Sequence, residues 1–261
     1  MTDGRAGSAE MLNNSKNFTG MGAKRAIVVG GTSGMGREIV HILVREGWKV
    51  GVAGRREGLL KGLEEEHPSR IVTEVIDVTA DDAPSRLELL IGKLGGMDLF
   101  ILSSGYGSQN RELETEIEQK TVMTNVYGFT MMVDAAYKWF REHGGKGHVA
   151  AISSVAGCKG LAQSASYSST KRFQWNYLQA LRQLSRSQNL DIRVSDIRPG
   201  FVSTDFIHHD YPMQMRPDYV AERIVRGLKH RRRVIVVDWR YSILLFVWKL
   251  IPNRLWERIR M

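Results

Sequence analysis

Cysteine is nearly absent from this sequence: Cys158 is the only one in 261 residues. A single thiol cannot form an internal disulfide, so the fold must rest on a buried core, and such cysteine usage is typical of reducing compartments. Long apolar runs are missing too, because the longest, Ile243 to Trp248, falls far short of the roughly 20 residues of a membrane-spanning helix. The first residues show no charged-then-apolar signal pattern. The sequence therefore predicts a cytoplasmic protein.

Acidic residues are in the minority, with 28 Asp and Glu against 37 Lys and Arg and a net charge of +9. Such an excess occurs in proteins that bind nucleic acid, membranes or phosphorylated ligands, and also in proteins whose basic surface only keeps them soluble. Nothing in the sequence indicates nucleic-acid recognition, so we expect no such partner. The hydrophobic content of 43% and charged content of 25% are those of a globular protein.

No linker, repeat or shift in composition divides the chain, which predicts one domain. Residues 1–24 are polar and glycine-rich without an apolar period, and we expect a flexible tail there. From residue 25 to 238, short apolar runs alternate with amphipathic helical stretches, which predicts an α/β fold of the Rossmann type, a doubly wound parallel sheet with helices on both faces. Seven strands are expected, at 26–29, 48–53, 71–76, 98–102, 148–152, 192–197 and 234–237. The helices are expected at 37–46, 57–66, 82–94, 116–142, 164–187 and 218–229.

A glycine-rich turn lies between the first strand and the first helix. The glycines allow a tight turn and a close backbone approach, and the N-terminus of the helix offers free N–H groups to a pyrophosphate. The order of strand, glycine turn and helix therefore predicts nucleotide binding through Gly30, Thr32, Ser33, Gly34, Met35 and Gly36.

Polar residues follow the carboxyl ends of the other strands as well. Gly54, Arg55 and Arg56 follow the second strand, Asp77 the third, Ser103 to Gly105 the fourth, Ser153 and Ser154 the fifth, and Pro199 to Thr204 the sixth. Ligands of doubly wound sheets bind beyond this edge, near the switch in strand order. The sequence thus predicts one site built from six loops.

Tyr167 and Lys171 lie four residues apart, which puts them on one face of a predicted helix. A tyrosine hydroxyl has a pKa of about 10 and is a poor base at neutral pH, but a nearby cation favours the phenolate. A lysine on the next turn would not lower that pKa to about 7 unaided, so a further cation, such as an oxidised nicotinamide, is required. The pair alone does not distinguish a catalytic site from an ordinary amphipathic helix.

Together these motifs resemble the short-chain dehydrogenase/reductase family, over roughly residues 25–237. The run from Val29 to Gly36 is similar to the family's Thr-Gly-x-x-x-Gly-x-Gly loop, with Val29 in place of Thr. The segment after the fourth strand departs from the family's Asn-Asn-Ala-Gly, because this chain has Leu102-Ser103-Ser104-Gly105. The resemblance implies that residues after several strands contact the cofactor: Asp77, Val78, Ser104, Gly105, Pro199, Gly200, Val202 and Thr204.

The resemblance also implies the catalytic roles. Ser154 would hydrogen-bond the substrate oxygen, and Tyr167 would be the general acid or base. Lys171 would hold the nicotinamide ribose and lower the Tyr167 pKa, and Asn125 would hold a water that relays protons to Lys171. Thus the implied catalytic set is Ser154, Tyr167, Lys171 and Asn125.

Cofactor choice depends on the residue after the second strand. An acidic side chain there would bind the ribose 2′-hydroxyl of NAD, whereas this chain has Gly54 followed by two arginines. A guanidinium can bind a 2′-phosphate bidentately. We predict NADP(H), with Arg55 as the principal contact and Arg56 beside it. Alternatively, both arginines are surface charges at the start of a helix.

The leading hypothesis is an NADP(H)-dependent oxidoreductase that acts on a hydrophobic carbonyl or alcohol substrate and forms a homodimer or homotetramer. The alternatives are a non-catalytic NADP(H) sensor and a membrane-associated reductase of a lipophilic ketone. No metal is expected, because His208 and His209 have no further ligands at metal-site spacing. Residues 205–216 are expected to form a lid, with Phe206, Tyr211, Met213 and Met215 facing the substrate.

The C-terminal extension, residues 239–261, interleaves Trp and Leu with Arg and Lys. Such a segment can lie in a membrane interface. It can equally pack on the protein or on another subunit, and the sequence leaves these alternatives open.

Overall fold

A computed structural model describes residues 23–203 and 212–259 of the chain. The predicted tail, Thr204 and most of the predicted lid, including Phe206 and Tyr211, lie outside these residues. Within them, seven parallel strands form one sheet in the order β3-β2-β1-β4-β5-β6-β7. The strands are β1 Arg25–Val29, β2 Lys49–Gly54, β3 Ile71–Val75, β4 Leu99–Leu102, β5 Lys146–Ile152, β6 Asp191–Arg198 and β7 Val234–Val236. This confirms the predicted doubly wound sheet, with boundaries within about two residues.

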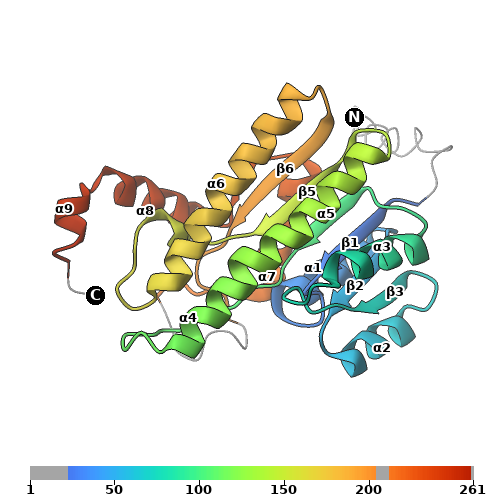
Figure 1. Ribbon diagram of the computed structural model, residues 1–261, viewed down its shortest axis with the longest axis horizontal. Coiled ribbons are helices and arrows are strands. Elements are labelled where there is room, and N and C mark those ends of the chain that lie inside the picture. Colours follow the sequence, from blue (N-terminus) through green and yellow to red (C-terminus); the bar gives the residue numbers. More distant parts are fainter. Residues whose placement is uncertain (1–22, 204–211, 260–261) are drawn as a thin grey trace, which may run out of the picture.

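The helices lie on both faces of the sheet (Figure 1). They are α1 Gly34–Arg45, α2 Glu57–Glu66, α3 Ala83–Leu94, α4 Thr115–Val122, α5 Phe129–Glu142, α6 Ala165–Ser187 and α7 Pro217–Lys229, followed by α8 Trp239–Leu250 and α9 Asn253–Trp256. Two buried cores result. In one core, α1, α2 and α7 pack against the sheet. In the other, α3, α5 and part of α6 pack against it. The strand sequences are apolar on both sides because both faces of the sheet are covered.

The long helix expected at 116–142 is interrupted. Between α4 and α5, residues Met123–Gly128 form a π-helical segment. A π-segment withdraws backbone carbonyls from the regular helical ladder, and such segments often occur at functional sites. Asn125 lies in this segment with no exposed surface, and its backbone carbonyl accepts a hydrogen bond from another helix.

The order of the strands places the switch point between β1 and β4. Their pairing, Val29 with Leu102, brings the glycine turn after β1 next to Ser103 and Ser104 after β4. Ser103 donates its backbone N–H to the carbonyl of Val29, 2.8 Å away. The sheet is therefore continuous at this point, although the segment after β4 lacks the two asparagines of the family that the sequence resembles.

The C-terminal extension is helical. α8 and α9 extend beyond one end of the sheet, past the start of α6 (Figure 1). Among the described helices, none is both long and apolar enough to cross a membrane.

Candidate active site

A cleft of about 1130 Å³ opens at the carboxyl edge of the sheet. Its lining contains most of the residues that the sequence predicts for the site, from six loops and α6. They are Gly30, Thr32, Ser33, Gly34, Met35, Arg55, Arg56, Asp77, Val78, Ser104, Gly105, Ser154, Tyr167, Lys171, Pro199, Gly200 and Val202. Gly36 and Asn125 lie behind this lining, and Thr204 lies outside the described residues.

The glycine turn leaves no space for side chains. Gly30 and Gly34 have φ angles of 85° and 51°, in the left-handed region that favours glycine. A Cβ at Gly30 would lie 2.6 Å from the backbone nitrogen of Ser104, and one at Gly36 would overlap the carbonyl oxygen of Gly30. Ser33 caps α1 without a side-chain hydrogen bond to the helix. The start of α1 lines the cleft through Gly34 and Met35, and a helix N-terminus without a side-chain cap fits the pyrophosphate of a dinucleotide.

Two arginines lie at the end of the cleft beside β2. Arg56 donates from Nη2 to Oγ1 of Thr32 (2.9 Å) and to Oγ of Ser33 (2.6 Å), which ties it to the glycine turn. Arg55 is exposed at the rim of the cleft. A Cβ at Gly54 would lie 3.1 Å from the Thr32 side chain. This end of the cleft carries two positive charges, and the residue at the end of β2 has no carboxylate.

Ser154 and Tyr167 come together at the floor of the cleft. Ser154 follows β5 and caps a short 3₁₀ turn, where its Oγ accepts from the N–H of Ala156 at 3.1 Å. Tyr167 is on the first turn of α6. Burial raises the pKa of Tyr167, and a hydrogen bond with Ser154 acts in the opposite direction. The phenol is thus protonated at neutral pH in this state of the protein.

Lys171 is one turn further along α6 and is 3% exposed. Its Nζ lies 5.6 Å from the centre of the Tyr167 ring and donates to the carbonyl of Ile152 and to Oε1 of Gln174, both at 3.1 Å. Burial lowers the pKa of Lys171 to about 8, while the charge of Asp196 acts to raise it. Since the pKa of Tyr167 is raised here, its lowering by Lys171 stays a prediction for the complex with the oxidised cofactor.

Gln174 connects Lys171 to Asn125, and the sequence reasoning missed it. Its Nε2 donates to the backbone carbonyl of Asn125 at 2.9 Å, and its Oε1 accepts from Lys171. Gln174 is 1% exposed. Gln174 takes one hydrogen bond of the Asn125 carbonyl, whose oxygen can accept a second, so the water relay stays a prediction. The signal in the sequence was a glutamine three residues after Lys171, on the same face of α6.

The Asn125 side chain fastens the segment after β4. Its Oδ1 accepts from the N–H of Tyr106 at 2.9 Å, and its Nδ2 donates to the Tyr106 carbonyl at 2.6 Å. Nδ2 also lies 3.2 Å from Oγ1 of Thr170 on α6. Asn125 thus joins three parts of the site, the segment after β4, the π-helical segment and α6.

A buried charged group lies beneath the two serines, and it was also missed. Asp196 on β6 has no exposed surface; it accepts from Ser153 Oγ and forms an ion pair with Arg198. The Arg198 guanidinium stacks 3.5 Å from the centre of the Trp175 ring, and Trp175 donates from Nε1 to the Ser154 carbonyl at 3.0 Å. This group fixes the backbone of the loop that carries Ser154. An acidic residue between Val194 and Ile197 of a predicted strand was the signal that could have found it.

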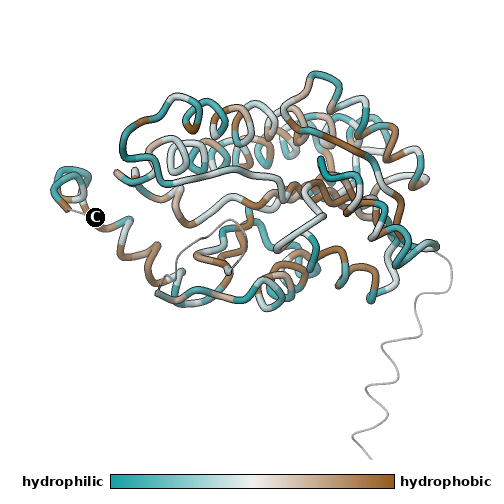
Figure 2. Tube along the Cα trace, turned by 90° about the horizontal axis from the view of Figure 1, so that it is seen from below, coloured by the Kyte–Doolittle hydropathy of each residue, from teal (hydrophilic) through white to brown (hydrophobic). Residues whose placement is uncertain are grey.

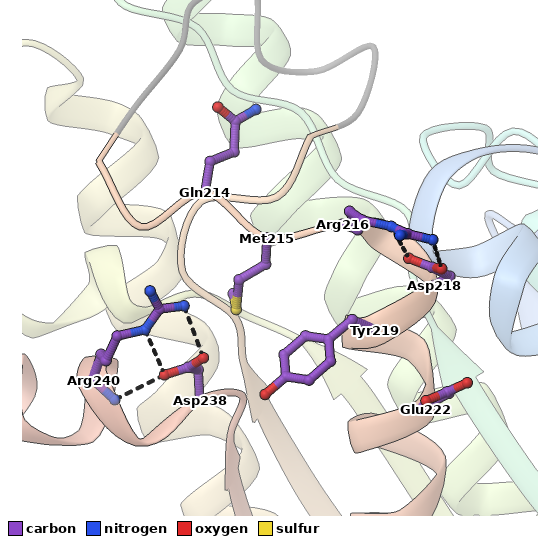
Figure 3. Close-up of a pocket in the computed structure, with 8 residues that line it drawn as sticks. All are labelled: Gln214, Met215, Arg216, Asp218, Tyr219, Glu222, Asp238 and Arg240. Atoms are coloured by element: carbon purple, nitrogen blue, oxygen red, sulfur yellow. Dashed lines mark hydrogen bonds and ion pairs between the residues drawn. The ribbon is translucent and has the colours of Figure 1, made fainter.

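A second, smaller hollow of about 560 Å³ lies between the start of α7 and the start of α8 (Figure 3). Two ion pairs border it, Arg216 with Asp218 and Arg240 with Asp238, the latter at 3.0 Å. Asp238 also caps α8 by accepting from the backbone N–H of Arg240 at 2.9 Å. The two ion pairs therefore fix the starts of α7 and α8, and no residue of this hollow is among those that line the cleft.

One group of potential metal ligands exists among the described residues, although no metal site was expected. Nitrogen and oxygen atoms of His41, Glu66 and His67 lie within 4.8 Å of one another on the surface. Arg37 donates from Nε to Nε2 of His41 at 3.3 Å, which places a cation against the group. It lies on α1 and at the end of α2, and its residues are not among those that line the cleft.

Comparisons with known proteins agree with this architecture. The family model for short chain dehydrogenases matches residues 24–214. An uncharacterized oxidoreductase of Myxococcus xanthus is 31% identical over 246 residues, which cover 91% of this chain and 96% of that protein.

Two solved structures are similar in fold. One, ElxO with NADP bound, has a TM-score of 0.75 and 20% identity, covering 85% of this chain and all of that one. The other, a short chain dehydrogenase/reductase from Burkholderia phymatum in complex with NAD, has a TM-score of 0.77 and 17% identity, covering 86% and 92%.

Proposed function

Because this chain belongs to the short-chain dehydrogenase family of oxidoreductases, whose members use a nicotinamide cofactor, we propose that it transfers hydride between NADP(H) and a carbonyl or alcohol substrate. The observation that carries the proposal is the hydrogen-bonded pair of Ser154 and Tyr167, next to Lys171, in the same cleft as the glycine turn. The fold supplies the cofactor cradle, and the hydroxyl pair supplies groups that act on a carbonyl oxygen.

Tyr167 is the proposed general acid in reduction. When bound, the nicotinamide supplies the hydride, and Tyr167 donates its proton to the carbonyl oxygen that gains the charge. The raised pKa of Tyr167 keeps the proton available at neutral pH. Ser154 donates a hydrogen bond to the same oxygen and stabilises the developing alkoxide. In the reverse direction, Tyr167 accepts the alcohol proton, and the nearby Lys171 ammonium and the oxidised nicotinamide favour its phenolate.

The proposed reaction has a direct test in a single variant. Tyr167→Phe removes the acid and keeps the ring, so NADPH binding is expected to persist while kcat falls by at least about 100-fold. Turnover is followed as NADPH oxidation across ketones of increasing size, and binding as quenching of protein fluorescence. A variant with undiminished kcat would rule out Tyr167 as the acid.

The preference for NADP(H) rests on charge. Arg55 and Arg56 offer two guanidiniums at the end of β2, and Gly54, the residue that ends this strand, has no carboxylate to repel a 2′-phosphate. Arg56 is held against the glycine turn, whereas Arg55 lies at the exposed rim, which supports Arg55 as the principal contact. Arg55→Ala should raise KM for NADPH about 10- to 100-fold and leave KM for NADH nearly unchanged. A lower KM for NADH than for NADPH in the wild-type protein would contradict the preference.

A non-catalytic NADP(H) sensor is less well supported. A sensor needs the glycine turn and the arginines, but it has no need of a serine, a tyrosine and a lysine fixed by buried partners. Trp175 and Gln174 hold the Ser154 loop and Lys171, respectively, at hydrogen-bond distance. Ordering these side chains costs conformational entropy, which a nucleotide-binding role alone does not explain.

The substrate is proposed to be hydrophobic. Large apolar side chains also line the cleft: Leu161 before α6, Phe201 after β6, and Leu244 and Trp248 on α8. Apolar walls with few polar groups favour an apolar ligand whose carbonyl is the part that is recognised.

A further inference from the structure

The outward side of α8 carries a stripe of five large apolar residues. Their side chains are 46–66% exposed. They are Trp239, Ile243, Phe246, Val247 and Leu250. The spacing of 4, 3, 1 and 3 residues puts them on one side of the helix. An isolated exposed leucine is ordinary, but a contiguous apolar stripe of this kind marks an interaction surface.

The opposite side of α8 is packed on the body. Tyr241 has no exposed surface, and its hydroxyl accepts from the N–H of Phe201 at 3.0 Å and donates to the carbonyl of Met213 at 3.1 Å. Leu245 is 4% exposed. The helix is therefore held in place, and the stripe is a fixed feature rather than the result of a loosely attached segment.

The segment after α8 is fastened to the body too. Lys159 donates to the Ile251 carbonyl at 2.9 Å, and Trp256 donates from Nε1 to the Gly160 carbonyl at 2.7 Å. Leu255 and Ile259, 53% and 45% exposed, are two further exposed apolar side chains after α8. Much of the trace of α8 has the brown of hydrophobic residues in Figure 2. We refer to these two side chains together with the five residues on α8 as the C-terminal apolar stripe.

Positive charge surrounds the C-terminal apolar stripe. Residues 239–259 contain four basic side chains, Arg240, Lys249, Arg254 and Arg258, and a single acidic one, Glu257. Lys249, Arg254 and Arg258 are exposed. A second copy of the chain docking symmetrically would bring these cations against their own counterparts, because a two-fold interface pairs the same patch with itself. A surface of anionic lipids complements both the apolar residues and the cations.

We propose that the C-terminal apolar stripe docks this enzyme on an anionic lipid membrane, with α8 lying in the interface. The same helix lines the cleft through Leu244 and Trp248 on its inner side. Docking would therefore bring the mouth of the cleft to the lipid surface. Resting on the proposed function, this points to a lipophilic carbonyl compound that partitions into membranes as the substrate class.

Vesicle co-sedimentation of the full chain tests the docking. Wild-type protein should sediment with vesicles of phosphatidylcholine and phosphatidylserine, and less with phosphatidylcholine alone. Phe246→Ser with Leu250→Ser removes two apolar side chains from the stripe and should weaken binding at least about tenfold. The matched control, Leu59→Ser with Leu89→Ser, removes two leucines that are 45% and 60% exposed on α2 and α3, and should bind like the wild type.

Two readouts separate this proposal from the proposed function. NADPH oxidation with a water-soluble carbonyl, measured without vesicles, should be the same in all three proteins, because neither pair of residues lines the cleft. Wild-type protein that fails to sediment with anionic vesicles would overturn the docking and leave the hydride transfer standing. Analytical ultracentrifugation tests whether a second copy of the chain occupies the stripe. If the wild type is a dimer, the stripe variant is a monomer and vesicle binding is unchanged, the stripe is a subunit interface and the membrane proposal is wrong.

Discussion

Gln174 is the residue for which the site makes its sharpest prediction. It is fully buried among polar partners, donating to the Asn125 carbonyl and accepting from Lys171. Gln174→Met keeps the length of the side chain and removes both hydrogen bonds. The Asn125 carbonyl belongs to the π-helical segment and then has no partner from α6, while the Lys171 ammonium keeps only the Ile152 carbonyl among its described partners.

The cost of the Gln174→Met substitution follows from these two groups. Leaving one buried polar group unsatisfied costs about 1–3 kcal/mol, so the loss of a partner at both groups should lower the free energy of unfolding by about 2–6 kcal/mol. If Lys171 also loses its position, kcat/KM should fall about 5- to 150-fold, since 1.36 kcal/mol corresponds to a factor of ten. The measurements are urea unfolding and NADPH oxidation at saturating and limiting carbonyl concentrations.

A second variant separates positioning from stability. Gln174→Glu places a carboxylate 3.1 Å from an ammonium whose pKa burial lowers to about 8. An opposite charge at this distance favours the protonated lysine, so the alkaline limb of the pH profile of kcat/KM, set by Lys171 in the cofactor-free protein, should move to higher pH. A merely structural role would not move that limb. The reasoning fails if Gln174→Met unfolds like the wild type with unchanged kcat/KM, or if the limb in Gln174→Glu stays in place.

Two further predictions concern the glycine turn and a buried histidine. Gly36→Ala should weaken NADPH binding at least about tenfold in fluorescence titration, because its Cβ would overlap the Gly30 carbonyl, whereas Gly62→Ala on α2, with open space around it, should bind normally and gain up to about 1 kcal/mol of stability. Burial, with Arg231 and Arg193 nearby, lowers the pKa of His148 to about 4 against an ordinary 6.5. The unfolded chain therefore binds this proton first as pH falls, so stability should drop by up to about 2 kcal/mol between pH 7 and pH 5. His148→Gln should show a smaller drop in denaturant titrations at the two pH values; equal drops would contradict the assignment.

The fold could be predicted almost completely from the sequence. A buried parallel sheet requires apolar runs, and a turn with positive φ angles and no space for a Cβ requires glycine. Local patterns also located Ser154, Tyr167 and Lys171, which line one cleft although they come from different elements. What could not be predicted is tertiary. Neither the π-helical segment nor the contact of Gln174 with Asn125, 49 residues apart, leaves a periodic signal. The charged group around Asp196 was missed because the hydropathy of the sequence shows a charged residue in a strand but not the partner with which it forms a buried ion pair.

The predictions for the C-terminal extension and for the lid had different outcomes. For the C-terminal extension, the sequence could not choose between packing on the body and facing outward, because α8 is apolar on both sides. The structure separates the two sides, with Tyr241 and Leu245 inward and Phe246 and Leu250 outward. The lid remains a prediction, because most of it lies outside the described residues. Within them Met215 lines the smaller hollow and not the cleft, so its predicted place beside the substrate is not what the structure has.

The span of the cleft along the chain has a consequence for how the protein acquires its activity. The first lining residue is Gly30 and the last is Trp248, so the walls of one site come from almost the whole length of the chain. The central pairing of β1 with β4 likewise joins residues about 70 positions apart. Non-local pairing of this kind is slow, and it requires distant segments to be present together. During synthesis, the glycine turn and β1 would leave the ribosome long before α8 exists, so a nascent chain could form helices early and yet possess no complete cleft until α8 has been released.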